Sequence, residues 1–211
     1  MGSIMMHLAI SNKLKDLIEI KDVNRFLIGS ILPDGVTANY GSKSNSHYKI
    51  ILDNGKKTFD LNRFRREFRD EILSDDLYLG YYLHLVQDLV NRIMVYDDYN
   101  WEPKVPGKVE KLHNDYALLN PYLVEKYKVV KNLELPKSFE NEEINKIHLF
   151  KAEDLINELK YHFEPYDKGE NFFFTKSMVD EYIERCVDSC TKELERFKNN
   201  EPLLELLTYT W

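Results

Sequence analysis

Residues 76–97, DLYLGYYLHLVQDLVNRIMVYD, decide the fold, because apolar side chains fall on almost every face of a helix built from them. A helix that is apolar all round is buried, so this segment is predicted to lie at the centre of the molecule. Ser74 and Asp75 precede it and provide a helix N-cap. His84 and Asp88 are polar exceptions on this helix, and their spacing of four residues places them on one face.

Further helices are predicted around this central one. Apolar spacing predicts helices over 6–20, 22–32, 61–72, 109–127, 141–163 and 175–198. The chain has only 8 glycines and 7 prolines in 211 residues, too few for the regular turns of a sandwich or barrel. We therefore expect an all-α fold in which residues 1–211 form a single domain of about seven helices.

Residues 36–59 break the helical pattern. They hold polar turn formers, a short apolar run from Tyr48 to Leu52 and an Asn54-Gly55 pair that is typical of a turn. We expect a long loop here, with a small hairpin at 48–59. Excursions of this length in a compact domain are usually functional or disordered.

Composition and charge exclude several classes of protein. Hydrophobic residues make up 43% of the chain, with 14 Tyr and 11 Phe, which excludes an intrinsically disordered chain. The net charge is −7 and the basic residues stand among acidic ones, which disfavours nucleic acid as a partner. No run approaches the roughly 18 apolar residues that span a bilayer, and the N-terminus lacks a leader pattern. We expect a cytoplasmic protein without a transmembrane segment.

The two cysteines, Cys186 and Cys190, are four residues apart within a helical pattern. Their side chains share a face, and helix geometry favours two buried thiols over a disulfide. A thiolate zinc site is disfavoured as well, because the chain has no second pair of cysteines.

Two interpretations of His84 and Asp88 follow from their place in an apolar helix. The side chains satisfy each other by a hydrogen bond, or they bind a metal ion with ligands from elsewhere. The further candidates are His7, Asp34 and His47. Taken singly, these three are typical of a surface histidine, a Pro-Asp-Gly turn and a solvated loop.

The order of these residues resembles a known family. His7, then FLIGSILPDG at 26–35, Ser46-His47 and GYYLHLVQD at 80–88 are similar to the zinc-dependent phospholipase C family, in particular its small bacterial members. Distant relatives of that family are the single-strand-specific zinc nucleases. The resemblance implies an all-α fold of the phospholipase C/P1 nuclease kind. The resemblance also implies that the metal ligands are His7, Asp34, His47, His84 and Asp88.

The chain also departs from the family pattern. Met94 stands where the family has a further histidine, and no His-x3-Glu motif follows. His113, with Asp115, is a potential substitute ligand, although a solvated or capping role is the favoured interpretation. Glu158 and His162 are interpreted as a surface pair. Secreted members use their N-terminal residue as a ligand, whereas six residues precede the first histidine here.

Three histidines and two aspartates suit zinc. Imidazole and carboxylate are zinc ligands, and one carboxylate can bridge two ions. We expect one or two zinc ions, or another divalent metal, with Asp88 as the bridging residue. Asp34 is expected to bind metal and to accept the proton of the attacking water, which makes it the candidate catalytic residue.

The predicted function is that of an enzyme, a zinc-dependent phosphoesterase. Metal-bound hydroxide would hydrolyse a phosphodiester or phosphomonoester, and the partner would be a small-molecule phosphate ester or a phospholipid head group. The alternative is a non-catalytic helical protein with a residual metal site used for stability or ligand sensing. Aromatic residues near the motifs either wall a pocket for a choline-like group or pack the helices. They are Tyr40, Tyr48, Tyr78, Tyr81, Tyr82 and Trp101.

Overall fold

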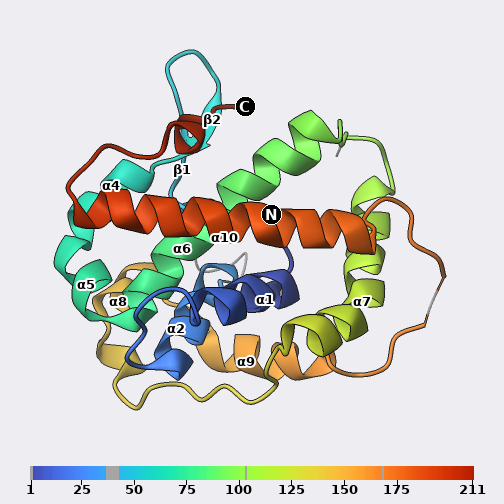
Figure 1. Ribbon diagram of the computed structural model, residues 1–211, viewed down its shortest axis with the longest axis horizontal. Coiled ribbons are helices and arrows are strands. Elements are labelled where there is room, and N and C mark those ends of the chain that lie inside the picture. Colours follow the sequence, from blue (N-terminus) through green and yellow to red (C-terminus); the bar gives the residue numbers. More distant parts are fainter. Residues whose placement is uncertain (1, 37–42, 103, 168) are drawn as a thin grey trace.

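Helix α6 (Asp76–Arg92) runs through the middle of the computed structural model, which describes residues 2–36, 43–102, 104–167 and 169–211. All its side chains from Leu77 to Asn91 are buried, so the predicted central position is confirmed. The carboxylate of Asp75 accepts the backbone N–H of Leu77, as expected of an N-cap. In Figure 1 the long helix α10 (Lys176–Lys198) crosses in front of α6.

The remaining helices surround this pair and make the fold all-α apart from one hairpin. They are α1 (Ile4–Leu14), α2 (Val23–Gly29), α3 (Lys43–Ser46), α4 (Leu61–Glu67), α5 (Arg69–Ser74), α7 (Lys108–Tyr127), α8 (Glu143–His148) and α9 (Ala152–Tyr161). Short 3-10 turns are η1 (Leu32–Asp34), η3 (Phe139–Asn141) and η4 (Glu205–Thr208). Helices α2, α5 and α10 pack on α6, while α1 packs on α7 and α10.

The hairpin predicted within 48–59 is confirmed. Strands β1 (Lys49–Ile51) and β2 (Lys57–Phe59) pair antiparallel, with Lys49 opposite Phe59. Trp211 adds to this hairpin, because its backbone N–H and C=O pair with those of Lys57 at 3.0 and 2.8 Å. Figure 1 shows the C-terminus beside the hairpin. The loop predicted from residue 36 onward includes residues 37–42, and with them Tyr40, which lie outside the described residues.

Several predicted helix boundaries are wrong. The helix predicted over 141–163 is two helices, because Leu149 adopts φ 52° and the Asn145 side chain accepts the next N–H, that of Phe150. The helix predicted over 61–72 is divided at Phe68, whose ring turns into the core against Tyr78. The described chain therefore has more, shorter helices than the seven expected.

Three more predicted helices end early. The first helix stops at Leu14 rather than residue 20. The chain then turns, and the Lys21 N–H donates to the Asp76 carboxylate. The second stops at Gly29, and a 3-10 turn containing Pro33 follows. The α-helical part of 76–97 ends at Arg92, where the backbone widens into the π-helical turn η2 (Ile93–Asp98).

Helices α2 and α6 touch backbone to backbone. A Cβ added to Gly29 would lie 2.0 Å from the Leu77 carbonyl oxygen, and one added to Gly80 would lie 2.2 Å from that of Phe26. Only glycine permits so close an approach, and the contact fixes α2 against the first turns of α6.

Cys186 and Cys190 are buried free thiols, as predicted. Burial raises the pKa of both, so they remain protonated and serve as core packing. In the described part of the chain, the helices are too short or too polar to cross a bilayer.

Candidate metal centre

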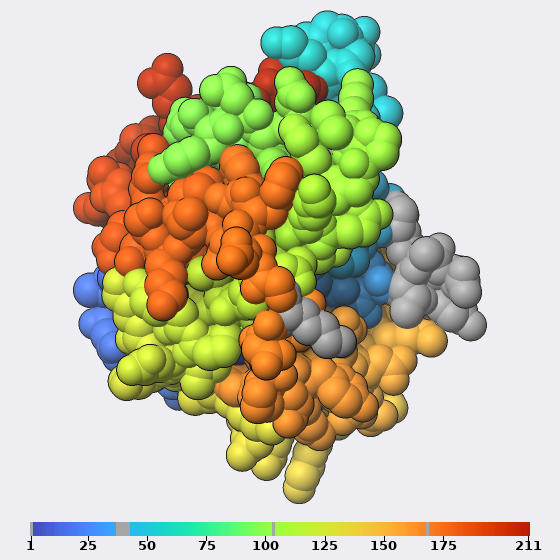
Figure 2. All heavy atoms as spheres, turned by 90° about the vertical axis from the view of Figure 1, so that its right-hand side faces the viewer, coloured from blue at the N-terminus to red at the C-terminus, as the bar shows by residue number. Residues whose placement is uncertain are grey.

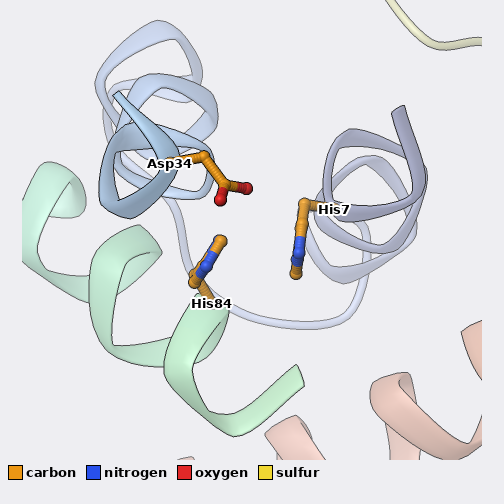
Figure 3. Close-up of side chains that lie close together, drawn as sticks. All are labelled: His7, Asp34 and His84. Atoms are coloured by element: carbon orange, nitrogen blue, oxygen red, sulfur yellow. The ribbon is translucent and has the colours of Figure 1, made fainter. Parts of the chain in front are cut away.

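The fold brings the five predicted ligands together from four elements. His7 comes from α1, Asp34 ends η1, His47 follows α3, and His84 and Asp88 lie on α6. Their side chains are at most 6% exposed. Figure 3 shows His7, Asp34 and His84 pointing toward a common space. Ligand atoms within 4.8 Å of one another form two groups, His7–Asp34–His84 and His47–His84–Asp88.

Each imidazole is oriented through its Nδ1 atom. The Nδ1 of His47 lies 2.6 Å from the Lys43 carbonyl oxygen, and that of His84 lies 2.8 Å from the Ser30 carbonyl oxygen. A carbonyl oxygen only accepts, so both Nδ1 atoms carry the hydrogen. His7 Nδ1 lies 2.8 Å from Gln87 Oε1 in the same manner. With Nδ1 occupied in this way, the Nε2 atoms are the ones that face inward, as in metal-binding histidines.

The spacing of the inward-facing atoms fits a tetrahedral ion. The Nε2 atoms of His47 and His84 are 3.2 Å apart and lie 3.3 and 3.6 Å from Asp88 Oδ2. Bonds of about 2.0–2.1 Å at tetrahedral angles place ligand atoms roughly 3.3 Å apart. The His84 Nε2–Asp88 Oδ2 separation of 3.6 Å is longer than an ordinary hydrogen bond, and Asp88 faces His7 and His47 as well, so His84 and Asp88 are not an isolated pair.

The two carboxylate oxygens of Asp88 face different imidazoles. Oδ1 lies 3.5 Å from His7 Nε2 and accepts the backbone N–H of Gly2 at 3.1 Å, while Oδ2 faces the other two rings. Both His7 Nε2 and Asp88 Oδ2 are buried and lack a hydrogen-bond partner among the described residues. Because buried unpaired polar atoms are costly, the arrangement calls for a cation at this point.

Both carboxyl groups are ionised at neutral pH. Burial by itself would raise the pKa of Asp88, but the His47, His7 and His84 imidazoles outweigh it and hold that pKa well below its ordinary value. Burial opposes ionisation of Asp34 too, and there His84 and Lys43 lower the pKa. The Lys43 ammonium lies 3.1 Å from Asp34 Oδ1 and is half exposed, so Asp34 is the ligand nearest to solvent.

Two cavities open on the centre. One, of about 340 Å³, reaches His47 and Asp88, and the other, of about 310 Å³, reaches Asp34 between α7 and α9. Figure 2 shows blue atoms of the N-terminal third lying deep between the surfaces of α7 and α9. A small molecule can therefore approach the imidazoles from two sides.

The histidines of the C-terminal half lie near the centre but do not join it. His113, Glu158 and His162 line the second cavity, yet among the described residues they belong to neither group of converging ligand atoms. His113 and Glu158 are exposed. His148 packs between Tyr48 and Phe150, and burial lowers its pKa to about 4.

Asp115 has the capping role and is not a ligand. Its buried carboxylate accepts three backbone N–H groups, from Phe172, Phe173 and Phe174, at 2.7–2.8 Å. These bonds attach the segment before α10 to α7. Thr175 then caps α10 by accepting the Met178 N–H.

Most of the aromatic residues considered for a pocket pack helices instead. Tyr81 and Tyr82 stack on Phe64, and Tyr78 contacts Phe68. Trp101 does line the first cavity.

The sequence did not indicate several groups at the centre. Gln87 and the Ser30 carbonyl orient imidazoles, and Gly2 reaches Asp88 although it precedes the first predicted ligand. Of these groups, Gln87 alone is indicated by the sequence, because it lies three residues after His84 and so near the same face of the helix. Comparison of the chain with protein-family models, curated proteins and solved structures finds no match in any of the three.

Proposed function

We propose that the chain is a zinc-dependent phosphoesterase, which hydrolyses a small phosphate ester at the candidate metal centre. One observation carries the proposal. Three imidazoles, each held at Nδ1 by an acceptor, turn their Nε2 atoms toward two carboxylates in a buried space. Such a space holds a cation, and the donor set of nitrogen and oxygen favours zinc over magnesium or calcium.

The two groups of ligand atoms accommodate one or two ions. His47 and His84 with Asp88 would form one site, and His7 and Asp34 with His84 would form the other, so His84 is common to both groups. Asp88 would be able to hold a cation on the His7 side as well, because its Oδ1 lies 3.5 Å from His7 Nε2. Bound zinc supplies Lewis acidity and lowers the pKa of a coordinated water to about 7.

The residues at the rim support hydrolysis rather than a closed structural site. Asp34 lies at the mouth and is placed to accept a proton from the attacking water. Lys43 lines both cavities, so its ammonium is available to a phosphoryl oxygen entering from either side. Structural zinc sites, in contrast, close all four positions with protein ligands.

Metal analysis paired with turnover tests this proposal. Purified protein should hold one to two equivalents of zinc and hydrolyse p-nitrophenyl phosphate or bis(p-nitrophenyl) phosphate. A chelator should abolish this activity and zinc restore it. His84→Ala should lose metal, whereas His113→Ala, a matched histidine on the cavity wall, should retain it.

Two outcomes would contradict the proposal. Failure to bind zinc on reconstitution would remove the metal centre. Full loading without turnover of any phosphate ester would favour a non-catalytic metal site that stabilises the fold or senses a ligand.

A further inference from the structure

The first cavity is lined by cations as well as by residues of the candidate metal centre. Lys49 of β1 and Arg92 at the end of α6 line it, and Asp88 is the one acid among its described lining residues. That acid belongs to the metal centre. The cavity therefore presents ligand atoms for a cation together with two positive side chains that are not among the candidate ligands.

Arg92 is held in place with one of its nitrogens left over, although Tyr96 and Asp97 lie beside its guanidinium. The Nε atom of Arg92 is buried and lacks a hydrogen-bond partner among the described residues. A buried guanidinium nitrogen without a hydrogen-bond partner destabilises the folded protein, and an anion in the cavity would provide that partner.

Aromatic rings hold the cations on the cavity wall. The Arg92 guanidinium lies 3.6 Å from the centroid of the Tyr96 ring and 4.7 Å from that of Trp211, and Lys49 Nζ lies 5.9 Å from Trp211. Cation–π contacts of this kind fix a charged group without neutralising it. Trp101 provides a further apolar wall in the same cavity.

We propose that the substrate is a small organic molecule with two anionic groups, of which one binds at the metal centre and the other between Lys49 and Arg92. The inference rests on the proposed phosphoesterase function and adds a substrate class to it. A phosphocholine head group does not fit, because its quaternary ammonium would face two cations across a low-dielectric cavity. A bisphosphate places compensating charge at both ends, and its organic part lies against Trp101 and Trp211.

Binding of pyrophosphate to the metal-free protein tests the cationic pocket apart from catalysis. After chelator treatment, calorimetry should detect pyrophosphate binding, and Lys49→Gln and Arg92→Gln should each weaken it about tenfold, the worth of one charge-assisted contact. Lys56→Gln is the matched control, since it removes a cation from the exposed turn of the same hairpin and should leave affinity unchanged. Equal affinity in all four proteins, or no binding at all, would overturn the proposal.

Turnover separates this inference from the proposed function. With zinc bound, fructose 1,6-bisphosphate should be hydrolysed with a higher kcat/KM than fructose 6-phosphate, and Arg92→Gln should reduce that preference through KM. Equal rates on both sugars would overturn the second-anion site while leaving the phosphoesterase intact. Pyrophosphate binding without any zinc-dependent turnover would instead support the pocket and contradict the proposed function.

Discussion

Replacing Gly80 by alanine should weaken zinc binding although the added methyl group would face α2 and not the candidate metal centre. Intrinsic helix propensity favours alanine by about 1 kcal/mol, so propensity alone predicts a more stable protein. The added Cβ, however, would lie 2.2 Å from the Phe26 carbonyl oxygen, and Cβ contacts under 3.0 Å are essentially never seen. Helix α2 must therefore retreat from α6 by about 0.8 Å, the difference between these two distances.

That retreat acts on His84 through the end of α2. Ser30 follows α2, and its carbonyl oxygen lies 2.8 Å from His84 Nδ1, so the separation would grow to about 3.6 Å and the hydrogen bond would be lost. Loss of such an orienting contact typically costs about 10–100-fold in metal affinity. Overpacking of the helix contact adds a loss of about 1–3 kcal/mol in the free energy of unfolding.

Zinc titration of metal-free protein and urea unfolding measure both effects. Gly35→Ala is the control, because its Cβ would meet the flexible end of the Leu155 side chain at 3.0 Å and the Leu32 carbonyl at 3.2 Å. It should cost less stability than Gly80→Ala. Zinc affinity and stability of Gly80→Ala equal to those of the unaltered protein would refute the reasoning.

Three other changes follow from the structure. Asp88→Asn should release at least one metal equivalent and reduce turnover by at least about a hundredfold with helicity unchanged, because its oxygens face all three imidazoles; wild-type zinc content would count against the bridging role. Asp115→Asn should cost about 2–4 kcal/mol in urea unfolding, since the buried carboxylate accepts three N–H groups, and an unchanged midpoint would show that the bonds contribute little. Burial lowers the pKa of His148 to about 4, below its unfolded value near 6.5, because the folded protein holds the ring neutral. The free energy of unfolding is therefore unaffected by this residue above pH 6.5 and falls as pH drops from 6.5 toward 4. His148→Asn should lose less stability than the unaltered protein between pH 7 and 5, and parallel unfolding curves would exclude this source of acid sensitivity.

The central helix could be predicted because local sequence determines it, and the same helix drew attention to His84 and Asp88, whereas His7, Asp34 and His47 were assigned as ligands only through the family resemblance. Residues 77–91 are apolar apart from a few positions, and a polar side chain in that context requires a partner wherever the helix lies. The N-cap expected at Ser74 and Asp75 was equally local, and the Asp75 carboxylate accepts the backbone N–H of Leu77.

Breaks and long-range contacts were not predictable in this way. Leu149 takes a left-handed conformation and ends a helix, although the helical spacing of apolar residues around it gives no sign of a helix end. The contact of Gly2 with Asp88 and the pairing of Trp211 with Lys57 join residues 86 and 154 positions apart. Their existence depends on how the helices pack, which apolar spacing does not specify.

The candidate metal ligands lie in the first half of the chain, whereas part of the wall of the cationic cavity comes from later residues. All five candidate ligands lie between residues 7 and 88, as does Lys49, whereas Arg92, Trp101 and Trp211 follow them. For the proposed function, substitutions at these later positions would alter which esters are accepted while the candidate ligands stay unchanged. Redesign of the substrate range would therefore begin with Arg92 and Trp101.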